Sequence, residues 1–275
     1  MLCIGGVMQI CEIAEKINKA GGRLYIVGGA VRDRFMGIKP NDYDFCVTGM
    51  EKEEFVQLFP KAKIRGKSFP VFDFENCEFA LARVERKITA GHKGFNVESN
   101  KNITIEEDLK RRDVTINSIA IDVLTDLVVD PFNGVEDIKN KILKATSTAF
   151  SEDPLRVYRV AKLSARYGFS VEKCTLEMMK QLKEELCTLS AERVYVELCD
   201  ALSTSEPSRF FNVLRDANCL DVHFKEIYDL IGVLQPIEHH PEGDAYNHSM
   251  EVLDRASSKT NDIVIRFSAL VHDLR

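Results

Sequence analysis

Two aspartates, Asp42 and Asp44, are the residues of this sequence best suited to chemistry. They stand two positions apart at the start of a short apolar run, residues 45–47, that predicts a β-strand. Side chains at i and i+2 share a strand face, so the carboxylates would lie about 7 Å apart along the strand. A divalent cation relieves their repulsion, and hard oxygen ligands that leave room for substrate phosphates suit Mg²⁺. The pair predicts a magnesium site, although lone D-x-D triplets are common on solvent-exposed surfaces.

A glycine turn precedes the aspartates. Residues 24–33 read LYIVGGAVRD, which is typical of a strand, a glycine turn and the start of a helix. Backbone N–H groups at a helix start favour an anion, and Gly28 and Gly29 let a phosphate approach the backbone. Arg32 could add a bidentate donor. Alone, such a turn is more often a structural bend; beside the aspartate pair it favours a phosphate site.

A third group of polar residues repeats every three positions: Asp153, Arg156, Arg159 and Lys162. Asp153 followed by Pro154 is typical of a helix start, so we expect a helix that begins there. Residues three apart are neighbours on one helix face, although the row drifts around the helix. The row is compatible with a surface ion-pair ladder and with the reading of a nucleotide base.

Base reading has a chemical basis in the edges of the bases. Cytosine and adenine each present an exocyclic amine beside a ring-nitrogen acceptor, so a carboxylate accepts from the amine and a guanidinium donates to the ring nitrogen. Guanine and uracil present a carbonyl beside an N–H, which would leave both protein groups mispaired. A paired aspartate and arginine would therefore select C and A.

These residues lie in two regions of the chain whose sequence patterns predict different secondary structure. Roughly the first 140 residues alternate short apolar runs with Gly and Pro, which predicts a mixed α/β region. We expect strands at residues 24–27, 44–47, 71–74, 79–84 and 119–123. From about Ser151 onward apolar residues recur at three and four, which predicts an all-helical remainder. Residues 144–150 form a short polar turn between the two regions.

Composition narrows the class of protein. The 275 residues suggest about two domains, with 45% hydrophobic and 29% charged residues, as in ordinary globular proteins. No run of eighteen apolar residues could span a bilayer, and residues 1–10 do not resemble a signal peptide. We therefore expect a cytoplasmic protein with no membrane partner. The eight cysteines form no C-x-x-C pair, which predicts reduced thiols.

The net charge of −6 argues mildly against a nucleic-acid partner, because phosphate binders usually carry a basic excess. Basic residues nevertheless cluster at residues 61–67, 83–93, 110–112 and 156–166. Each cluster is compatible with a solvated surface or with phosphate binding.

Six motifs follow one another in the chain: GGAVRD at 28–33, NDYDF at 41–45, FALARVERK at 79–87, EDLKRRDVTIN at 107–117, DPFNG at 130–134 and EDPLRVYR at 152–159. Together they resemble the class II tRNA nucleotidyltransferases, the bacterial CCA-adding enzymes and their poly(A) polymerase relatives. The resemblance covers nearly the whole chain. It implies an α+β protein: an α/β nucleotidyltransferase head with a mixed sheet at residues 1–146, a helical neck and body at 147–236, and an incomplete HD-type helical region at 237–275.

The resemblance also implies roles for single residues. Asp42 and Asp44 would be catalytic and hold Mg²⁺. Eight further residues would bind the nucleotide: Gly29, Arg32, Arg112, Asp113, Asp153, Arg156, Arg159 and Lys162.

Within this set, Asp153 and Arg156 resemble the base-reading pair, and Asp113 would accept a hydrogen bond from a ribose 2′-OH. Arg112 and Asp113 are also compatible with a strand-end salt bridge. At Lys162 the family more often has arginine, so we expect a phosphate contact there instead of a bidentate one. Glu85 is a candidate third carboxylate for the metals.

The implied activity is CCA addition: C, C and A are added from CTP and ATP to the tRNA 3′ end without a nucleic-acid template. The partners would be tRNA, ATP and CTP, with no stable protein partner. Residues 87–104 show no deletion of the loop that the family shortens in CC-only enzymes, which disfavours CC-only activity. Addition of A alone and poly(A) synthesis remain alternatives.

The last residues carry a second candidate metal site. His240 to Asp244, then His248 and the His272–Asp273 pair, resemble the start of an HD phosphohydrolase domain. The metal of such a domain is held by a His, a His-Asp pair and a later Asp, which would fall beyond Arg275. Two alternatives from other classes follow: an HD-type phosphohydrolase whose head only binds RNA, and a non-catalytic RNA binder. Otherwise His248 and His272 are ordinary helix residues.

Overall fold

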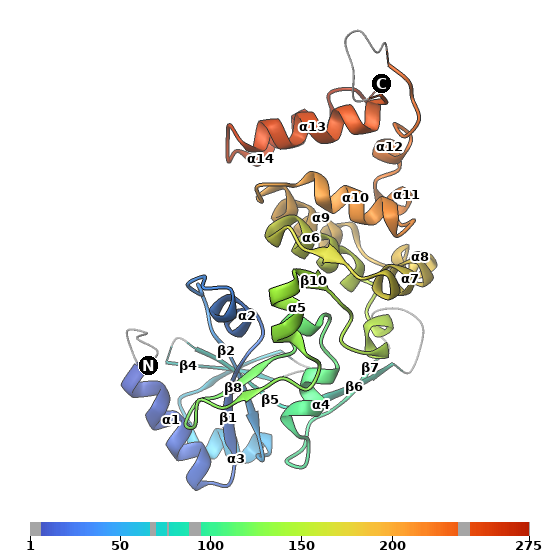
Figure 1. The fold of residues 1–275 in the computed structure, drawn as a ribbon. Coiled ribbons are helices and arrows are strands. Elements are labelled where there is room, and N and C mark those ends of the chain that lie inside the picture. The colour runs from blue at the N-terminus through green and yellow to red at the C-terminus, as the bar shows by residue number, and fades with distance from the viewer. Residues whose placement is uncertain (1–6, 67–69, 76, 88–94, 236–242, 275) are drawn as a thin grey trace. The chain divides into compact units, whose positions relative to one another are not determined.

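The computed structural model describes residues 7–66, 70–75, 77–87, 95–235 and 243–274, whose fold is drawn in Figure 1. Two compact units are present, and each is described by itself. Of the described residues, 7–87, 95–140 and 145–149 form the head unit, and 141–144 and the residues from 150 onward form the helical unit. The predicted domain boundaries at residues 146 and 236 stay predictions.

A seven-stranded sheet forms the centre of the head unit. Its strands are β1 Arg23–Val27, β2 Asp44–Thr48, β3 Lys63–Arg65, β4 Val71–Phe74, β5 Cys77–Leu81, β8 Ala120–Asp122 and β9 Val128–Val129. They lie in the order β3-β4-β5-β2-β1-β8-β9. β2 and β5 run parallel and the other neighbours antiparallel, so the sheet is mixed, as predicted.

Four of the five predicted strands are confirmed, with ends shifted by at most one residue. The fifth, residues 79–84, is wrong as a single strand: β5 ends at Leu81, and Val84–Lys87 forms β6, which pairs with β7 (Phe95–Glu98) in a separate sheet. The last bond of the β2–β5 ladder runs from the Ala82 N–H to the Val47 carbonyl at 2.8 Å. The next N–H, that of Arg83, donates to the Asp108 carboxylate at 3.3 Å, so the chain leaves the main sheet there. The side chains of β6 and β7 beyond Val84 lie outside the described residues.

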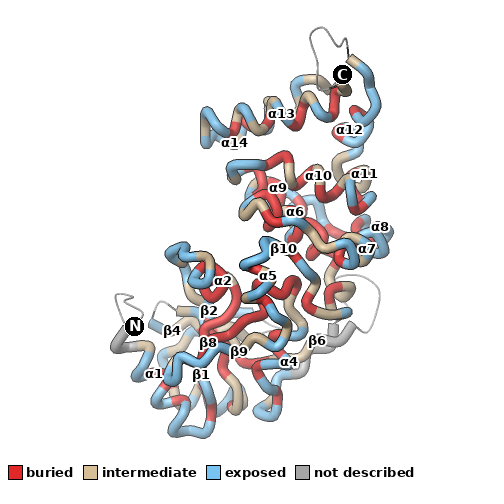
Figure 2. Tube along the Cα trace, viewed as in Figure 1, coloured by how far each residue is buried: buried red, intermediate tan, exposed pale blue. Residues whose placement is uncertain are grey.

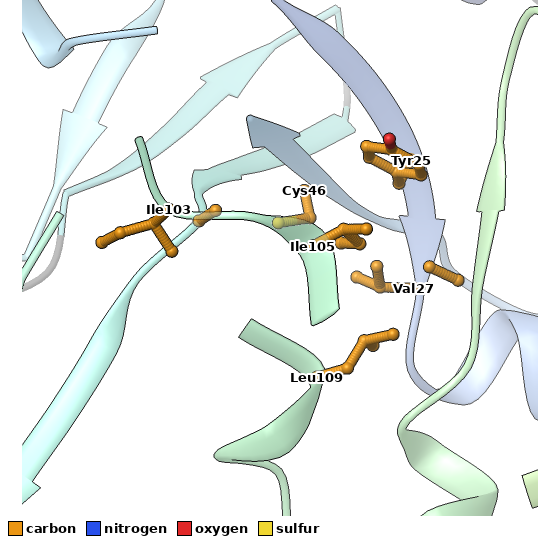
Figure 3. Close-up of a cluster of buried hydrophobic side chains, with 8 residues drawn as sticks. Tyr25, Val27, Cys46, Ile103, Ile105 and Leu109 are labelled. Carbon is orange, nitrogen blue, oxygen red and sulfur yellow. The ribbon is translucent and has the colours of Figure 1, made fainter. Parts of the chain in front are cut away.

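Alternation along the strands gives the sheet two apolar faces. On one face Val27 and Cys46 pack with Leu109 of the short helix α4 (Ile105–Lys110), as Figure 3 shows. On the other face Phe45 stacks on Phe79 with ring centroids 5.2 Å apart. Because odd and even positions are both buried, the strand ends, where polar side chains emerge, become the places for a site.

Short helices surround the sheet. They are α1 Val7–Lys19, α2 Gly29–Phe35, α3 Lys52–Leu58, α4, α5 Gly134–Asn140 and the 3₁₀ turn η1 Thr115–Asn117. α5 packs closely on η1, since a Cβ built on Gly134 would lie 2.2 Å from the Thr115 carbonyl oxygen. Asp130 accepts the Gly134 and Val135 N–H groups at 2.7 and 3.0 Å, which fixes the start of α5. The DPFNG motif therefore positions η1.

The helical unit confirms the predicted change of pattern, and Figure 2 shows buried segments along its helices. Its elements are β10 Ile142–Leu143, α6 Arg156–Tyr167, β11 Ser170–Val171, α7 Lys173–Gln181, α8 Lys183–Leu186, α9 Ala191–Leu202, α10 Ser208–Asp216, α11 Leu220–His223, α12 Lys225–Tyr228, α13 Ala245–Ser257 and α14 Ile263–Val271. A 3₁₀ turn, η2 Thr148–Glu152, leads into it. No helix among the described residues is long and apolar enough to cross a membrane.

The predicted helix start, with Asp153 as N-cap and Pro154 as the first helical residue, is two residues too early, since α6 begins at Arg156. A turn precedes the helix, in which the Arg156 N–H donates to the Asp153 carbonyl at 3.1 Å. The Asp153 side chain accepts the Leu155 N–H at 3.1 Å. Asp153 thus satisfies a backbone donor as a capping residue does, but from a turn that is not yet α-helical.

Candidate nucleotide and metal site

The glycine turn and the second aspartate come together at one end of the sheet. Antiparallel pairing places Val27 opposite Asp44, so Gly28, which follows Val27, lies beside that carboxylate. A Cβ built on Gly28 would lie 3.1 Å from Arg112 Nη1 and 3.7 Å from Asp44 Oδ2. Gly28 also has φ of 70°, which favours glycine. Three residues from separate motifs therefore meet at this turn.

The two aspartates lie where a strand begins. Asp44 is the first residue of β2 and Asp42 precedes it, and both are exposed. The rings of Tyr43 and Phe45 stack with centroids 6.5 Å apart, as expected where alternate side chains share a face. Desolvation raises the pKa of Asp44, the charge of Asp42 raises it further, and Arg112 opposes both. An accessible pair of mutually repelling carboxylates fits a hard divalent cation.

Glu78 is a neighbour of the aspartate pair that the sequence reasoning missed. It is the register partner of Asp44 on β5, so both side chains share a face and line a cavity of about 180 Å³. Glu78 forms an ion pair with Arg65 at 2.6 Å. Because Glu78 alternates with the buried Phe79, the sequence could have indicated which face of the strand Glu78 lies on. It could not have indicated that β5 pairs in parallel with β2. The side chain of the predicted Glu85 lies outside the described residues.

A buried aspartate, Asp108, holds the arginines of the EDLKRRD motif. It is 1% exposed and accepts from Arg111 Nη2 at 2.7 Å and from Arg112 Nη2 at 3.1 Å. Burial acts to raise the pKa of Asp108, but the two guanidiniums outweigh it, so the pKa is lowered. The sequence reasoning gave Asp108 no role, although its spacing of three and four to the arginines is that of helix neighbours. Asp108 fixes Arg112 beside Gly28.

Arg32 and Asp113, two predicted nucleotide contacts, are joined through Asn117. Arg32 is 7% exposed and donates to Asn117 Oδ1 at 2.7 Å and to Asp33 Oδ1 at 2.7 Å. Asn117 Nδ2 donates to Asp113 Oδ1 at 3.1 Å. A Cβ built on Gly29 would lie 3.3 Å from Arg32 Nη2, so this guanidinium sits against the turn. The phosphate contact of Arg32 and the ribose contact of Asp113 stay predictions.

The predicted base-reading row lies at the start of α6 in the helical unit. Arg156 is 7% exposed, whereas Arg159 is exposed. Asp153 Oδ2 lies 3.7 Å from Arg193 Nη2 of α9. Lys162 pairs with Glu197 and, at 3.1 Å, with Asp200 on the same helix. The ion pairs join α6 to α9; the roles of the row toward a nucleotide stay predictions.

The last helices bring together three of the predicted HD residues. Single ligand atoms of His248, His272 and Asp273 all lie within 4.8 Å of one another. The two imidazole Nε2 atoms are 3.3 Å apart, and Asp273 accepts from Gln235 at 3.1 Å. His240 lies outside the described residues. Two imidazoles and a carboxylate form a donor set that transition metals accept.

Comparison with known proteins decides the family. A family model for the poly A polymerase head domain matches residues 24–144, and one for the probable RNA and SrmB-binding site of polymerase A matches residues 168–230. Curated proteins called multifunctional CCA protein, from Nitrosospira multiformis and Shewanella denitrificans, are 42% and 46% identical over 92% of this chain. The chain belongs to the class II tRNA nucleotidyltransferase family. It spans 61% and 62% of the length of these two relatives.

The class II fold extends through both units. A solved structure of a CCA-adding enzyme, apo form II, matches 99% of this chain and 64% of its own with a TM-score of 0.73 at 23% identity. At that identity the match concerns the fold, and it confirms the predicted α/β head followed by helices. The six motifs thus occupy a class II nucleotidyltransferase scaffold, in which the Gly28 turn, Asp44 and Arg112 meet.

Proposed function

We propose that this chain is a CCA-adding tRNA nucleotidyltransferase, which adds C, C and A from CTP and ATP to the tRNA 3′ end without a nucleic-acid template. The observation that carries the proposal is the meeting of the Gly28 turn, Asp44 and Arg112. It puts a phosphate-accepting backbone, a carboxylate of the predicted metal pair and a guanidinium within one site. The names of the curated relatives and of the structural neighbour support the same activity.

The reaction is in-line attack of the RNA 3′-OH on the α-phosphate of the triphosphate, and pyrophosphate leaves. Asp42 and Asp44 would hold Mg²⁺, which when bound would supply activation of the attacking hydroxyl and charge stabilisation at the leaving group. The Gly28–Gly29 turn admits the triphosphate, while Arg112, fixed by Asp108, neutralises its charge. Asp113 accepts from the ribose 2′-OH, which selects ribonucleotides. No covalent protein intermediate is required.

Nucleotide choice belongs to the start of α6. Asp153 accepts from the exocyclic amine of C or A, and Arg156 donates to the ring nitrogen. Arg159 and Lys162 contact the nucleotide farther along the row. Lys162 already pairs with Glu197 and Asp200, so its ammonium must contact the nucleotide while it keeps these ion pairs. We expect the reaction to take place in the cytoplasm.

The test is incubation with a tRNA that lacks its 3′ CCA, Mg²⁺ and each labelled triphosphate in turn. The proposal predicts incorporation from CTP, then from ATP, and none from UTP or GTP. Incorporation of A alone would indicate an A-adding enzyme, and a long A tail would indicate a poly(A) polymerase. No incorporation from any triphosphate would contradict the proposal.

A second activity is favoured by a separate observation, the His248, His272 and Asp273 cluster. These residues could hold a metal that activates water for the hydrolysis of a phosphoester. The chain would then release phosphate or open a 2′,3′-cyclic phosphate in the presence of a divalent metal. His248→Ala should abolish that hydrolysis and leave nucleotide incorporation unchanged; hydrolysis that survives the substitution would remove the cluster from consideration.

A further inference from the structure

A cavity of about 300 Å³ lies in the head unit, on the face of the sheet opposite to that of Asp44. Two of its lining residues, Ile26 and Ile121, are register partners, and Ile26 also pairs with Phe45. These three side chains therefore share one face of the sheet. Asp44 precedes Phe45 on β2, so its side chain belongs to the other face. Neither Asp42 nor Asp44 lines this cavity.

Aliphatic side chains form the floor of the cavity. Ile26 and Ile121 come from the sheet, while Ala30 and Val31 come from α2, which follows β1 and packs against it (Figure 1). All four residues are buried. A volume of about 300 Å³ equals that of roughly ten water molecules, at about 30 Å³ each, so the cavity takes only a small ligand. A slot between a helix and a sheet, with an aliphatic floor, favours a flat apolar body.

The polar groups around this floor are cations and a hydroxyl. Lys39 and Arg34 are exposed, and Tyr43 is half-buried. Both Nη atoms of Arg34 donate to Asp126, at 3.0 and 3.2 Å, so the charge of Arg34 is already balanced.

The Lys39 ammonium and the Tyr43 hydroxyl remain available to a ligand. Neither makes a hydrogen bond or an ion pair with another residue in the part of the chain that the structure describes. No aspartate or glutamate is among the described residues that line the cavity. Its unbalanced charge is therefore that of one ammonium, which a single negative charge would match.

We propose that this cavity binds a small organic monoanion with a flat apolar body, such as an aromatic carboxylate. The anionic group accepts from the Lys39 ammonium and the Tyr43 hydroxyl, and the ring covers Ile26 and Ile121. A nucleoside triphosphate carries several negative charges, which one free ammonium and an aliphatic floor do not match. The site is separate from the nucleotide site, and the inference does not depend on the proposed function of the chain.

The test compares two probes of one shape, 2-naphthoate and its uncharged analogue 2-naphthamide, on the whole chain with ¹³C-labelled isoleucine methyl groups. 2-Naphthoate should shift the methyl NMR signals of Ile26 and Ile121 with a Kd of about 1 mM or lower. 2-Naphthamide should bind about threefold more weakly, because it lacks the charge. Equal affinity for the two probes, or no shift at these two isoleucines, would overturn the proposal.

Ile105 reports on the other face of the sheet, where it packs in one cluster with Val27. Its methyl signal should stay in place during the 2-naphthoate titration, because the probe lies on the opposite face. A larger shift at Ile105 than at Ile26 would put the probe on the face of the nucleotide site and would overturn a separate site.

Two variants of Lys39 test the source of the charge preference. Lys39→Gln should weaken 2-naphthoate binding about threefold and leave 2-naphthamide binding as it is, whereas Lys39→Arg should keep the wild-type preference. Lys61→Gln is the matched control, since Lys61 is an exposed lysine of the head that does not line the cavity. An unchanged affinity of Lys39→Gln for 2-naphthoate would show that Lys39 does not select the anion, which contradicts the proposed recognition.

Discussion

The head unit and the helical unit hold their predicted site aspartates in opposite ways. In the head, Asp42 and Asp44 are exposed, and Asp44 has its pKa raised by desolvation and by its neighbour. In the helical unit, Asp153 is half-buried and faces both a backbone N–H and Arg193. Open, repelling carboxylates suit a cation that must also bind substrate, whereas a fixed carboxylate suits a choice between similar bases. We therefore expect the head to set the rate and the helical unit to set the selectivity.

The largest expected effect comes from removing a carboxylate of the head. Asp44→Asn should reduce incorporation of CTP and ATP alike by roughly 1,000-fold or more, because charge stabilisation of the reacting phosphate is lost. Single-turnover rates on a CCA-less tRNA measure the effect. Asp126→Asn, which changes an exposed aspartate paired with Arg34, is the matched control and should retain its rate. A rate for Asp44→Asn within tenfold of the wild type would assign the chemistry elsewhere.

Asp108 tests whether the head arginines need their buried partner. Asp108→Asn should cost about 3 kcal/mol of unfolding free energy at neutral pH, because two guanidiniums lose a buried carboxylate. The pKa of Asp108 is lowered in the folded state, so its contribution is complete above the ordinary aspartate value of about 3.9 and is lost as pH falls through the folded value. Denaturant unfolding of both proteins from pH 7 downward checks the sign. A stability difference that grows toward acid pH would contradict it.

Gly28 tests the close approach on which the head site depends. Gly28→Ala adds a Cβ at positive φ that would meet Arg112 Nη1 at 3.1 Å. We expect about 1–2 kcal/mol of destabilisation and about a tenfold rise in KM for both CTP and ATP. Gly37 is the control: its φ is also 70°, but nothing lies within 4 Å of its added Cβ, so Gly37→Ala should cost stability alone. Equal KM values for the two variants would show that the approach has no role in binding.

The smallest expected change in rate, with a change in selectivity, comes from the helical unit. Asp153→Ala should lower the preference for CTP over UTP by about 10- to 100-fold and slow CTP incorporation by less than tenfold. Competition between labelled CTP and UTP measures the ratio directly. If Asp153→Ala slows all nucleotides equally, the division of roles between the units is wrong.

Features that depend on residues close together in the chain were predicted from the sequence, and features that depend on residues far apart were not. The Asp42–Asp44 pair and the Gly28 turn are local patterns, and both occupy the elements expected of them. The break after Leu81 escaped prediction because the Arg83 N–H donates to the carboxylate of Asp108, which lies far along the chain.

The residues that support the site were harder to predict than the residues that form it. Glu78 lies beside Asp44 only through the parallel pairing of β5 with β2, and no local periodicity encodes that register. Arg193 reaches Asp153 across forty positions through the packing of two helices. The ion pairs of Asp108 could have been predicted, because its spacing to Arg111 and Arg112 is that of helix neighbours.

The most direct test of the central claim, that the head holds the metal and the helical unit chooses the base, is a Mg²⁺ titration of single-turnover CTP incorporation. Wild type, Asp44→Glu and Asp153→Ala are titrated side by side. The account predicts that Asp44→Glu raises the Mg²⁺ concentration at half-maximal rate by about tenfold, since a longer carboxylate misplaces the ligand, whereas Asp153→Ala leaves it unchanged. An unchanged Mg²⁺ requirement in Asp44→Glu, or a shifted one in Asp153→Ala, would contradict it.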